Sequence, residues 1–136
     1  MSRMLHPMLK IGLHEAALYD ILERVSIYTG VPVDDMKSKS RLRKIVYARQ
    51  LYMILAHKVM RHRYSLTEIG WPIRRDHATV IHGIRAQENL CETMEPHRQW
   101  VFNLLEQLYE RLTPVERQNA DYFARTHLII KKQSRL

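Results

Sequence analysis

Apolar side chains recur at intervals of three and four residues along most of this 136-residue chain. This spacing gathers them on one face of a helix. It predicts a helix over residues 13–28, a long helix ending near Arg61, and three more over residues 77–94, 97–112 and 114–127. No alternating strand pattern competes with these segments. We therefore expect an all-α fold, in which residues 1–12, which lack a periodic pattern, form a flexible N-terminus.

Two helix-start signals stand close together in the middle of the chain. Ser65 and Glu68 have the spacing of a capping box. Gly70 and Pro72 then end that helix within about one and a half turns. Asp76 is a good N-cap residue and precedes a second run of apolar positions at helical spacing. A short helix, a tight break and a second helix outline a helix-turn-helix, which presents the start of its second helix to base edges in the major groove.

Positive charge is concentrated before and within this unit. The whole chain carries a net charge of +8, whereas the stretch from Lys37 to Arg75 holds eleven Lys or Arg and one acid. All of the excess therefore lies in that stretch. A localised basic stripe is expected for a protein that binds a polyanion. A merely solvated surface is the alternative, but beside a helix-turn-helix the charge favours nucleic acid.

The first residues of the second helix have side chains suited to base recognition. His77 can donate to a purine acceptor, and Asp76 can accept from the cytosine amine. Thr79 offers a hydroxyl and a methyl group, and Ala78 can touch a thymine methyl. Asp76 can equally serve as an N-cap alone, and His77 as an ordinary surface histidine. We expect His82, deeper in the helix, to be structural.

These residues also carry a family resemblance. Residues 75–82, RDHATVIH, resemble the signature motif of the DNA-binding domain of the bacterial chromosomal replication initiator, DnaA. Residues 65–70 and 39–50 match that domain too, and the likeness covers about residues 18–90. The resemblance implies a Trp-repressor-like helix-turn-helix domain with added C-terminal helices, which binds double-stranded DNA sequence-specifically. It divides the chain into the flexible residues 1–12, an initiator-type domain over 13–95 and a helical extension over 96–136.

The resemblance also assigns roles to single residues. In the family, an Arg at the position of Arg41 enters the minor groove, and the Arg-Gln pair matching Arg49 and Gln50 binds phosphates. From spacing alone, Arg41 could equally be one more phosphate-facing charge. We predict major-groove base contacts from Arg75, Asp76, His77, Ala78 and Thr79, a minor-groove contact from Arg41, and phosphate contacts from Lys39, Arg43, Arg49, Gln50, Ser65, Arg74 and Arg85.

The helix-turn-helix departs from the family pattern in three places. Ala78 stands where the initiator commonly has Thr, and Thr67 stands where it often has Pro. The turn through Trp71 and Pro72 is about one residue shorter than usual. The resemblance therefore predicts the mode of binding more firmly than the target sequence.

Other classes of function find little support in the sequence. There is no phosphate-binding loop of the G-x-x-x-x-G-K-[ST] type, so we expect neither an enzyme nor a nucleotide or other cofactor. The eight histidines form no metal-binding spacing, so we expect no metal. No stretch approaches the roughly 18 apolar residues of a membrane span. The single Cys91 suits a reducing cytosol.

Two hypotheses of function follow. The favoured one is a cytoplasmic protein, nucleoid-associated in a bacterium or phage-encoded in a bacterial host, that occupies initiator-box-like sites and so regulates replication initiation or transcription. The alternative is an adaptor that binds a replication or regulatory protein through its C-terminal helices. Residues 97–127 are either added core or a surface for a homodimer or protein partner, and a leucine stripe alone does not separate these readings.

Overall fold

The computed structural model describes the backbone of residues 2–129 and the side chains from Ala16 to Ile129. Every element in this part of the chain is helical, which confirms the all-α prediction. The elements are α1 (Ser2–Thr29), α2 (Val33–Lys37), α3 (Arg43–Met60), α4 (Leu66–Gly70), the 3-10 turn η1 (Trp71–Ile73), α5 (His77–Thr93), α6 (Glu95–Tyr109), α7 (Pro114–Phe123) and the π-helical segment η2 (Ala124–Ile129).

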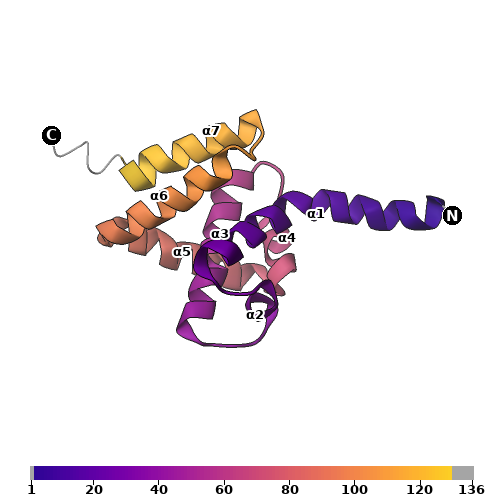
Figure 1. Ribbon diagram of the computed structural model, residues 1–136, viewed down its shortest axis with the longest axis horizontal. Helices are drawn as coiled ribbons and strands as arrows, with labels where there is room; N and C mark the ends of the chain where they lie inside the picture. Colours follow the sequence, from indigo (N-terminus) through magenta and orange to yellow (C-terminus); the bar gives the residue numbers. More distant parts are fainter. Residues whose placement is uncertain (1, 130–136) are drawn as a thin grey trace.

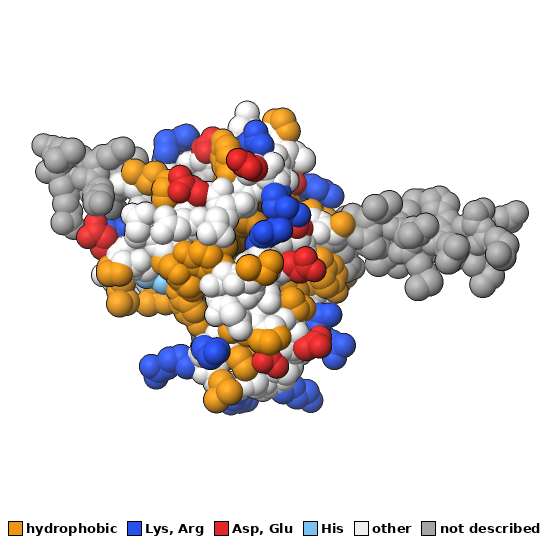
Figure 2. Space-filling view, viewed as in Figure 1, with side chains coloured by type: hydrophobic (Ala, Val, Ile, Leu, Met, Phe, Trp, Pro, Cys, Tyr) orange, Lys and Arg blue, Asp and Glu red, His pale blue; other side chains and the backbone are white. Residues whose placement is uncertain are grey.

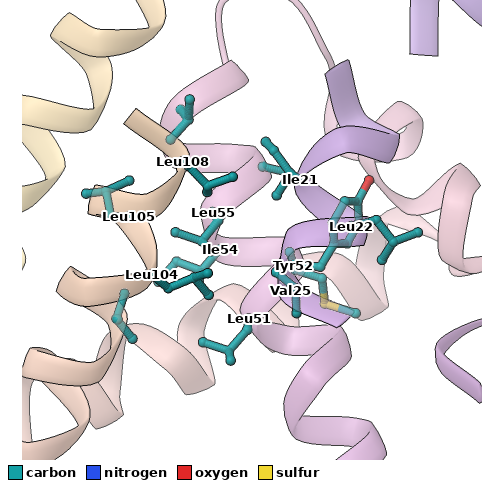
Figure 3. Packing of buried hydrophobic residues seen from close by; sticks show 14 of the residues in the cluster. Ile21, Leu22, Val25, Leu51, Tyr52, Ile54, Leu55, Leu104, Leu105 and Leu108 are labelled. Atoms are coloured by element: carbon teal, nitrogen blue, oxygen red, sulfur yellow. The ribbon is translucent and has the colours of Figure 1, made fainter. Parts of the chain in front are cut away.

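Helix α3 forms the centre of the fold (Figure 1). Eleven of its 18 residues are buried, so it is apolar on most sides, as a central helix must be. Figure 3 shows its core residues between two other helices. Side chains of α1 approach from one side and those of α6 from the other. The α3 residues Leu51, Ile54 and Leu55 lie between Ile21, Leu22 and Val25 of α1 and Leu104, Leu105 and Leu108 of α6.

Helix α1 begins earlier than the apolar pattern predicts. We expected it at Leu13, after a flexible stretch, but its backbone is helical from Ser2. Its N-terminal part projects beyond the other helices (Figure 1). The predicted packing of Leu13 lies outside the described side chains. The other end agrees with the sequence, since Gly30 adopts a φ of 77° and its N–H donates to the Ser26 carbonyl at 2.8 Å.

The C-terminal helices belong to the same core as the rest of the chain. The leucine stripe of α6 is buried, with Val101, Leu104 and Leu108 at 0 % exposure. Beside it, the Trp100 ring stacks on Tyr47 of α3 with centroids 5.3 Å apart. Residues 97–127 therefore supply core. The stripe that suggested a partner surface contacts the protein itself.

Two boundaries in this region differ from the prediction. Pro96 does not separate helices but lies in the first turn of α6, where its missing N–H costs nothing. The α-helical geometry of α7 ends at Phe123, and residues to Ile129 continue as a π-helix. The predicted capping box of Thr113 and Glu116 is confirmed.

A chain of polar side chains joins α3, α5 and α6 inside this core. The Tyr47 hydroxyl lies 2.7 Å from Nδ1 of His97, and Nε2 of His97 lies 2.9 Å from Oε1 of Gln87. Gln87 is fully buried and donates from Nε2 to Oε1 of Gln50 at 3.2 Å. A neutral His97 with its proton on Nε2 satisfies each of these bonds. Burial lowers the pKa of His97, which favours this neutral form.

We expect the free energy of unfolding to decrease as pH falls below about 6.5. Burial lowers the pKa values of His57 and His97 in the folded state, so the unfolded chain takes up protons that the folded chain resists. His57 also buries an Nδ1 atom without a described hydrogen-bond partner. Urea denaturation at a series of pH values measures the effect. His97→Gln, which hydrogen-bonds but does not titrate, should give a shallower profile, and an unchanged slope would contradict the assignment.

Candidate nucleic-acid interface

The helix-turn-helix consists of α4, η1 and α5. Ser65 caps α4 by accepting from the Glu68 N–H at 3.2 Å, and Glu68 Oε1 accepts from the Ser65 N–H at 2.8 Å. The predicted capping box is therefore confirmed. Pro72 lies buried at the start of η1 and ends the α-helical hydrogen bonding. The predicted short helix, break and second helix are all present.

The turn is closed by contact between the backbones at Gly70 and Arg75. The Gly70 carbonyl accepts from the Arg75 N–H at 2.9 Å. A Cβ atom at Gly70 would overlap the Arg75 carbonyl oxygen and lie 3.1 Å from Cγ2 of Val80. Only glycine allows this approach. Arg74 between them adopts a left-handed conformation, with φ 57° and ψ 45°.

We expect Arg74→Gly to raise the free energy of unfolding by about 1 kcal/mol, because the left-handed region is strained for a residue with a Cβ atom. The same change removes an exposed cation beside the turn and should weaken DNA binding. Arg74→Ala is the matched control. It should weaken DNA binding equally without the gain in stability, and equal stability of the two variants would count against the strain.

The first turn of α5 presents its side chains to solvent. His77, Ala78 and Thr79 are all exposed, and the C-terminal helices do not cover them. Asp76 caps the helix, since its Oδ1 accepts from the Thr79 N–H at 2.9 Å. That backbone hydrogen bond is the main cause of the lowered pKa of Asp76. The carboxylate therefore has a structural role here, and its outer face remains exposed.

Helix α5 is held close to α3 behind this exposed tip. Val80 and Ile84 are buried between the helices. Gly83 faces α3 so closely that a Cβ atom there would overlap the Met53 sulfur and lie 3.2 Å from Cγ of Gln50. The position of the exposed first turn of α5 is thus set by the packing of this helix against the central helix of the fold.

Arg49 has a different position from the one we expected. We predicted a phosphate contact, but the side chain is 5 % exposed. Its Nε donates to the Met36 carbonyl at 2.8 Å, and its Nη2 donates to the carbonyls of Ser38 and Ser40 at 2.8 and 2.7 Å. Burial, and then the nearby Arg75, lower the pKa of Arg49. This guanidinium holds the α2–α3 loop (residues 38–42) rather than projecting from the surface.

Arg75 is likewise engaged within the protein. We predicted a base contact, but its Nη2 donates to the Ser38 carbonyl at 2.6 Å. Its Nη1 donates to the carbonyls of Ile73 and Arg74 at 3.0 and 3.2 Å. The side chain is half-buried beside the turn. A base contact would require it to leave these carbonyls.

The α2–α3 loop and the start of α3 carry exposed cations. Lys39 and Arg41 are exposed in the loop, and Arg43 is exposed at the first position of α3. Arg41 and Leu90, near the C-terminal end of α5, line one shallow depression. At the other end of α5, Arg75 donates to the Ser38 carbonyl of the loop, so the loop lies along α5. Figure 2 shows Lys and Arg side chains gathered around this end of the molecule.

The remaining predicted residues lie nearby with mixed exposure. Arg85 is exposed on α5, and Ser65 is exposed at the α4 cap. Gln50 is half-buried, and its Oε1 accepts from Gln87. Its own amide N–H groups have no described partner and border the gap between α3 and α5.

One residue of this surface was missed by the sequence reasoning. We expected His82 to be structural, but it is exposed. It lines a small cleft of about 90 Å³ together with Thr79 and Arg75. The helical spacing contains the signal, because residues three apart share a face of the helix and Thr79 was already a predicted base contact.

Other kinds of site are not apparent among the described residues. From Ala16 to Ile129, no three His, Cys, Asp or Glu side chains come together in a way that could hold a metal ion. No helix in the described part of the chain has the length and apolar character needed to cross a bilayer.

Comparison with known proteins gives a consistent result. A family described as bacterial dnaA protein helix-turn-helix matches residues 18–86. Proteins named chromosomal replication initiator protein DnaA are similar to this chain. The one from Wolbachia sp. subsp. Brugia malayi is 36 % identical over 93 residues, covering 68 % of this chain and 20 % of the relative. The one from Flavobacterium psychrophilum is 35 % identical over 95 residues, covering 69 % and 20 %.

These matches are confined to one part of the relatives. The chain spans about a fifth of the length of the curated proteins it matches. A relative from Desulfotalea psychrophila is 40 % identical over 65 residues, which is 13 % of its length. No solved structure matches the chain significantly.

Proposed function

The chain belongs to the family of bacterial DnaA helix-turn-helix domains, and on that premise we propose that it binds specific sites in double-stranded DNA. Domains of this family are DNA-binding modules without catalytic groups of their own. The proposed target is a site like those of the initiator. The proposed action is occupancy of that site on the bacterial chromosome or in cytoplasmic phage DNA, which regulates replication initiation or transcription.

One observation carries this proposal. The loop that carries the exposed Arg41 is bonded at its Ser38 carbonyl to Arg75, which directly precedes the N-cap of α5, so this loop lies beside the exposed first turn of α5. A helix tip in the major groove and an arginine in the adjacent minor groove can then engage one duplex face together. The cations of the α2–α3 loop and of α5 surround these groups and can neutralise phosphates.

The positions of the side chains refine the proposed contacts. We assign base contacts to the tip of α5, with His82 added, and the minor-groove contact to Arg41. Arg49 and Arg75 are reassigned to the support of the loop. The proposed contacts are to bases from Asp76, His77, Ala78, Thr79 and His82, and to phosphates from Lys39, Arg43, Gln50, Ser65, Arg74 and Arg85.

We expect Arg41→Ala and His77→Ala each to weaken binding of the preferred duplex by about 1–3 kcal/mol and to relax discrimination between sequences. Both side chains are exposed and have no described hydrogen-bond partner in the protein, so the fold should persist. Arg85→Ala is the matched control, because loss of a phosphate contact should weaken all duplexes alike. Equal losses on preferred and scrambled duplexes for His77→Ala would remove it from the base contacts.

Selection of bound duplexes from a random pool tests the proposal directly. The winning sequence is then compared with a scrambled duplex of the same composition across a range of salt concentrations. A preference that persists at each salt concentration supports site-specific binding. Equal affinity for both duplexes throughout would overturn it and leave a basic protein with general affinity for polyanions.

The adaptor hypothesis loses the observation that motivated it. The leucine stripe of α6 is buried against α3 rather than offered to a partner. A second copy or another protein would have to use the outer faces of α6 and α7. We therefore propose DNA binding alone as the function.

A further inference from the structure

The α2–α3 loop connects the proposed minor-groove residue to the rest of the protein, yet it has few bonds of its own. It contains no helical turn. Within it, the Ser40 N–H donates to the Ser38 hydroxyl and the Leu42 N–H donates to the Ser40 hydroxyl, both at 3.2 Å. These weak side-chain turns do not fix where the exposed Arg41 lies relative to α5.

Ser38 is held to α2, since its N–H and its hydroxyl both donate to the Asp35 carbonyl, at 3.1 and 2.6 Å. Toward α3 and α5, two guanidinium groups supply the restraint. Arg49 of α3 donates to the carbonyls of both Ser38 and Ser40. Arg75, which directly precedes the N-cap of α5, donates to the same Ser38 carbonyl at 2.6 Å. The loop is therefore bonded to the central helix by one arginine and to the start of the recognition helix by the other.

We propose that Arg49 and Arg75 are positioning residues that hold Arg41 in register with the tip of α5, so that the minor-groove and major-groove contacts form one coupled unit. This inference rests on the proposed function, and it assigns specificity to two side chains that touch no base. The Ser38 carbonyl accepts hydrogen bonds from both arginines, and it therefore links the loop that carries Arg41 to the start of α5.

The energetic cost of this arrangement supports a dedicated role. A buried guanidinium without a carboxylate partner is costly. Neither Arg49 nor Arg75 forms an ion pair with a described residue, and Arg75 is close enough to lower the pKa of Arg49. Two like charges that converge on one carbonyl repel each other in the free protein. A polyanion on this surface would offset that repulsion. The clamp that Arg49 and Arg75 form on the loop should therefore tighten when DNA binds.

A double-mutant cycle on the selected duplex tests the coupling. Alone, Arg41→Ala should weaken binding roughly 5- to 150-fold. The Arg75→Gln background loses or weakens the bond to Ser38. In that background, Arg41→Ala should weaken binding of the duplex by no more than about threefold. Arg49→Met removes three bonds at similar volume and should give the same result if it folds. Arg75→Gln alters a half-buried side chain and keeps the test open if Arg49→Met does not fold.

Arg85→Ala is the matched control background, because Arg85 is an exposed cation of α5 without a bond to the loop. There Arg41→Ala should cost as much as in the unaltered protein. Additive losses in the Arg75→Gln background, on a duplex that the protein still discriminates, would overturn the coupling.

Amide hydrogen exchange separates this inference from the function on which it rests. Exchange across residues 38–42 should be faster in Arg75→Gln than in the unaltered protein, and slower in the DNA complex. Unchanged exchange in Arg75→Gln would overturn the clamp even where DNA binding is specific. Faster exchange together with indifference between duplexes would overturn the proposed function and leave the clamp as a feature of the fold.

Discussion

Raising the salt concentration from about 50 to about 200 mM is expected to weaken DNA binding about a thousandfold. Six cations are exposed around the proposed interface, and each phosphate neutralised adds about 0.9 to the slope of log affinity against log salt. The predicted slope is therefore about −5. The six are the cations assigned DNA contacts above and Lys44, which is exposed next to Arg43 in the first turn of α3: Lys39, Arg41, Arg43, Lys44, Arg74 and Arg85.

Fluorescence anisotropy with a labelled duplex at several salt concentrations measures this slope. Arg43→Ala should make it shallower by about one unit, because Arg43 is exposed at the start of α3. The scrambled duplex should give a similar slope, since phosphates carry no sequence. A slope shallower than about −2 would mean that most of these cations do not reach the backbone.

Gly70→Ala is expected to lower the free energy of unfolding by about 3 kcal/mol or more, at the upper end of the cost of overpacking. The added methyl group would meet the Arg75 carbonyl oxygen, which is backbone and cannot rotate away. Relief would require α4 and α5 to separate, which would also displace the tip of α5 and reduce DNA affinity. Denaturant unfolding and DNA titration of the same variant measure both effects.

Gly30→Ala is the matched control for this prediction. Gly30 has a φ of 77°, and a Cβ atom there meets nothing within 4 Å. The substitution should cost only the strain of the left-handed region, about 1 kcal/mol. A Gly70→Ala protein as stable as Gly30→Ala would show that the turn can yield.

Much of the fold could be predicted because local signals and long-range packing agree. The capping boxes at Ser65 and Thr113 each satisfy backbone donors within four residues, so their chemistry is visible in the sequence. The periodic stripe of α6 reflects the one face that this helix buries, and the denser apolar positions of α3 reflect its place at the centre of the fold. The start of α1 carries no such stripe, so its helical backbone from Ser2 was not predicted.

The site was predicted less completely, because cations look alike in a sequence. Arg41 and Arg49 both fall in a basic run, yet Arg41 is exposed and Arg49 is buried, with 5 % of its surface exposed. Their difference depends on where the Ser38 and Ser40 carbonyls lie, which is a property of the folded loop. The same applies to His97, whose partners Tyr47 and Gln87 are 50 and 10 residues away.

The chain of polar side chains that runs from Tyr47 through His97 and Gln87 to Gln50 bears on how this protein can be dissected. Removing everything after Glu95 would delete His97 and leave Oε1 of the fully buried Gln87 without its hydrogen-bond donor. It would also expose to water the side of α3 that packs against the leucines of α6. A fragment cut there loses part of its scaffold as well as its tail. Other roles of α6 and α7 are better tested by substitutions on their solvent-exposed faces, because these leave the packing of the core unchanged.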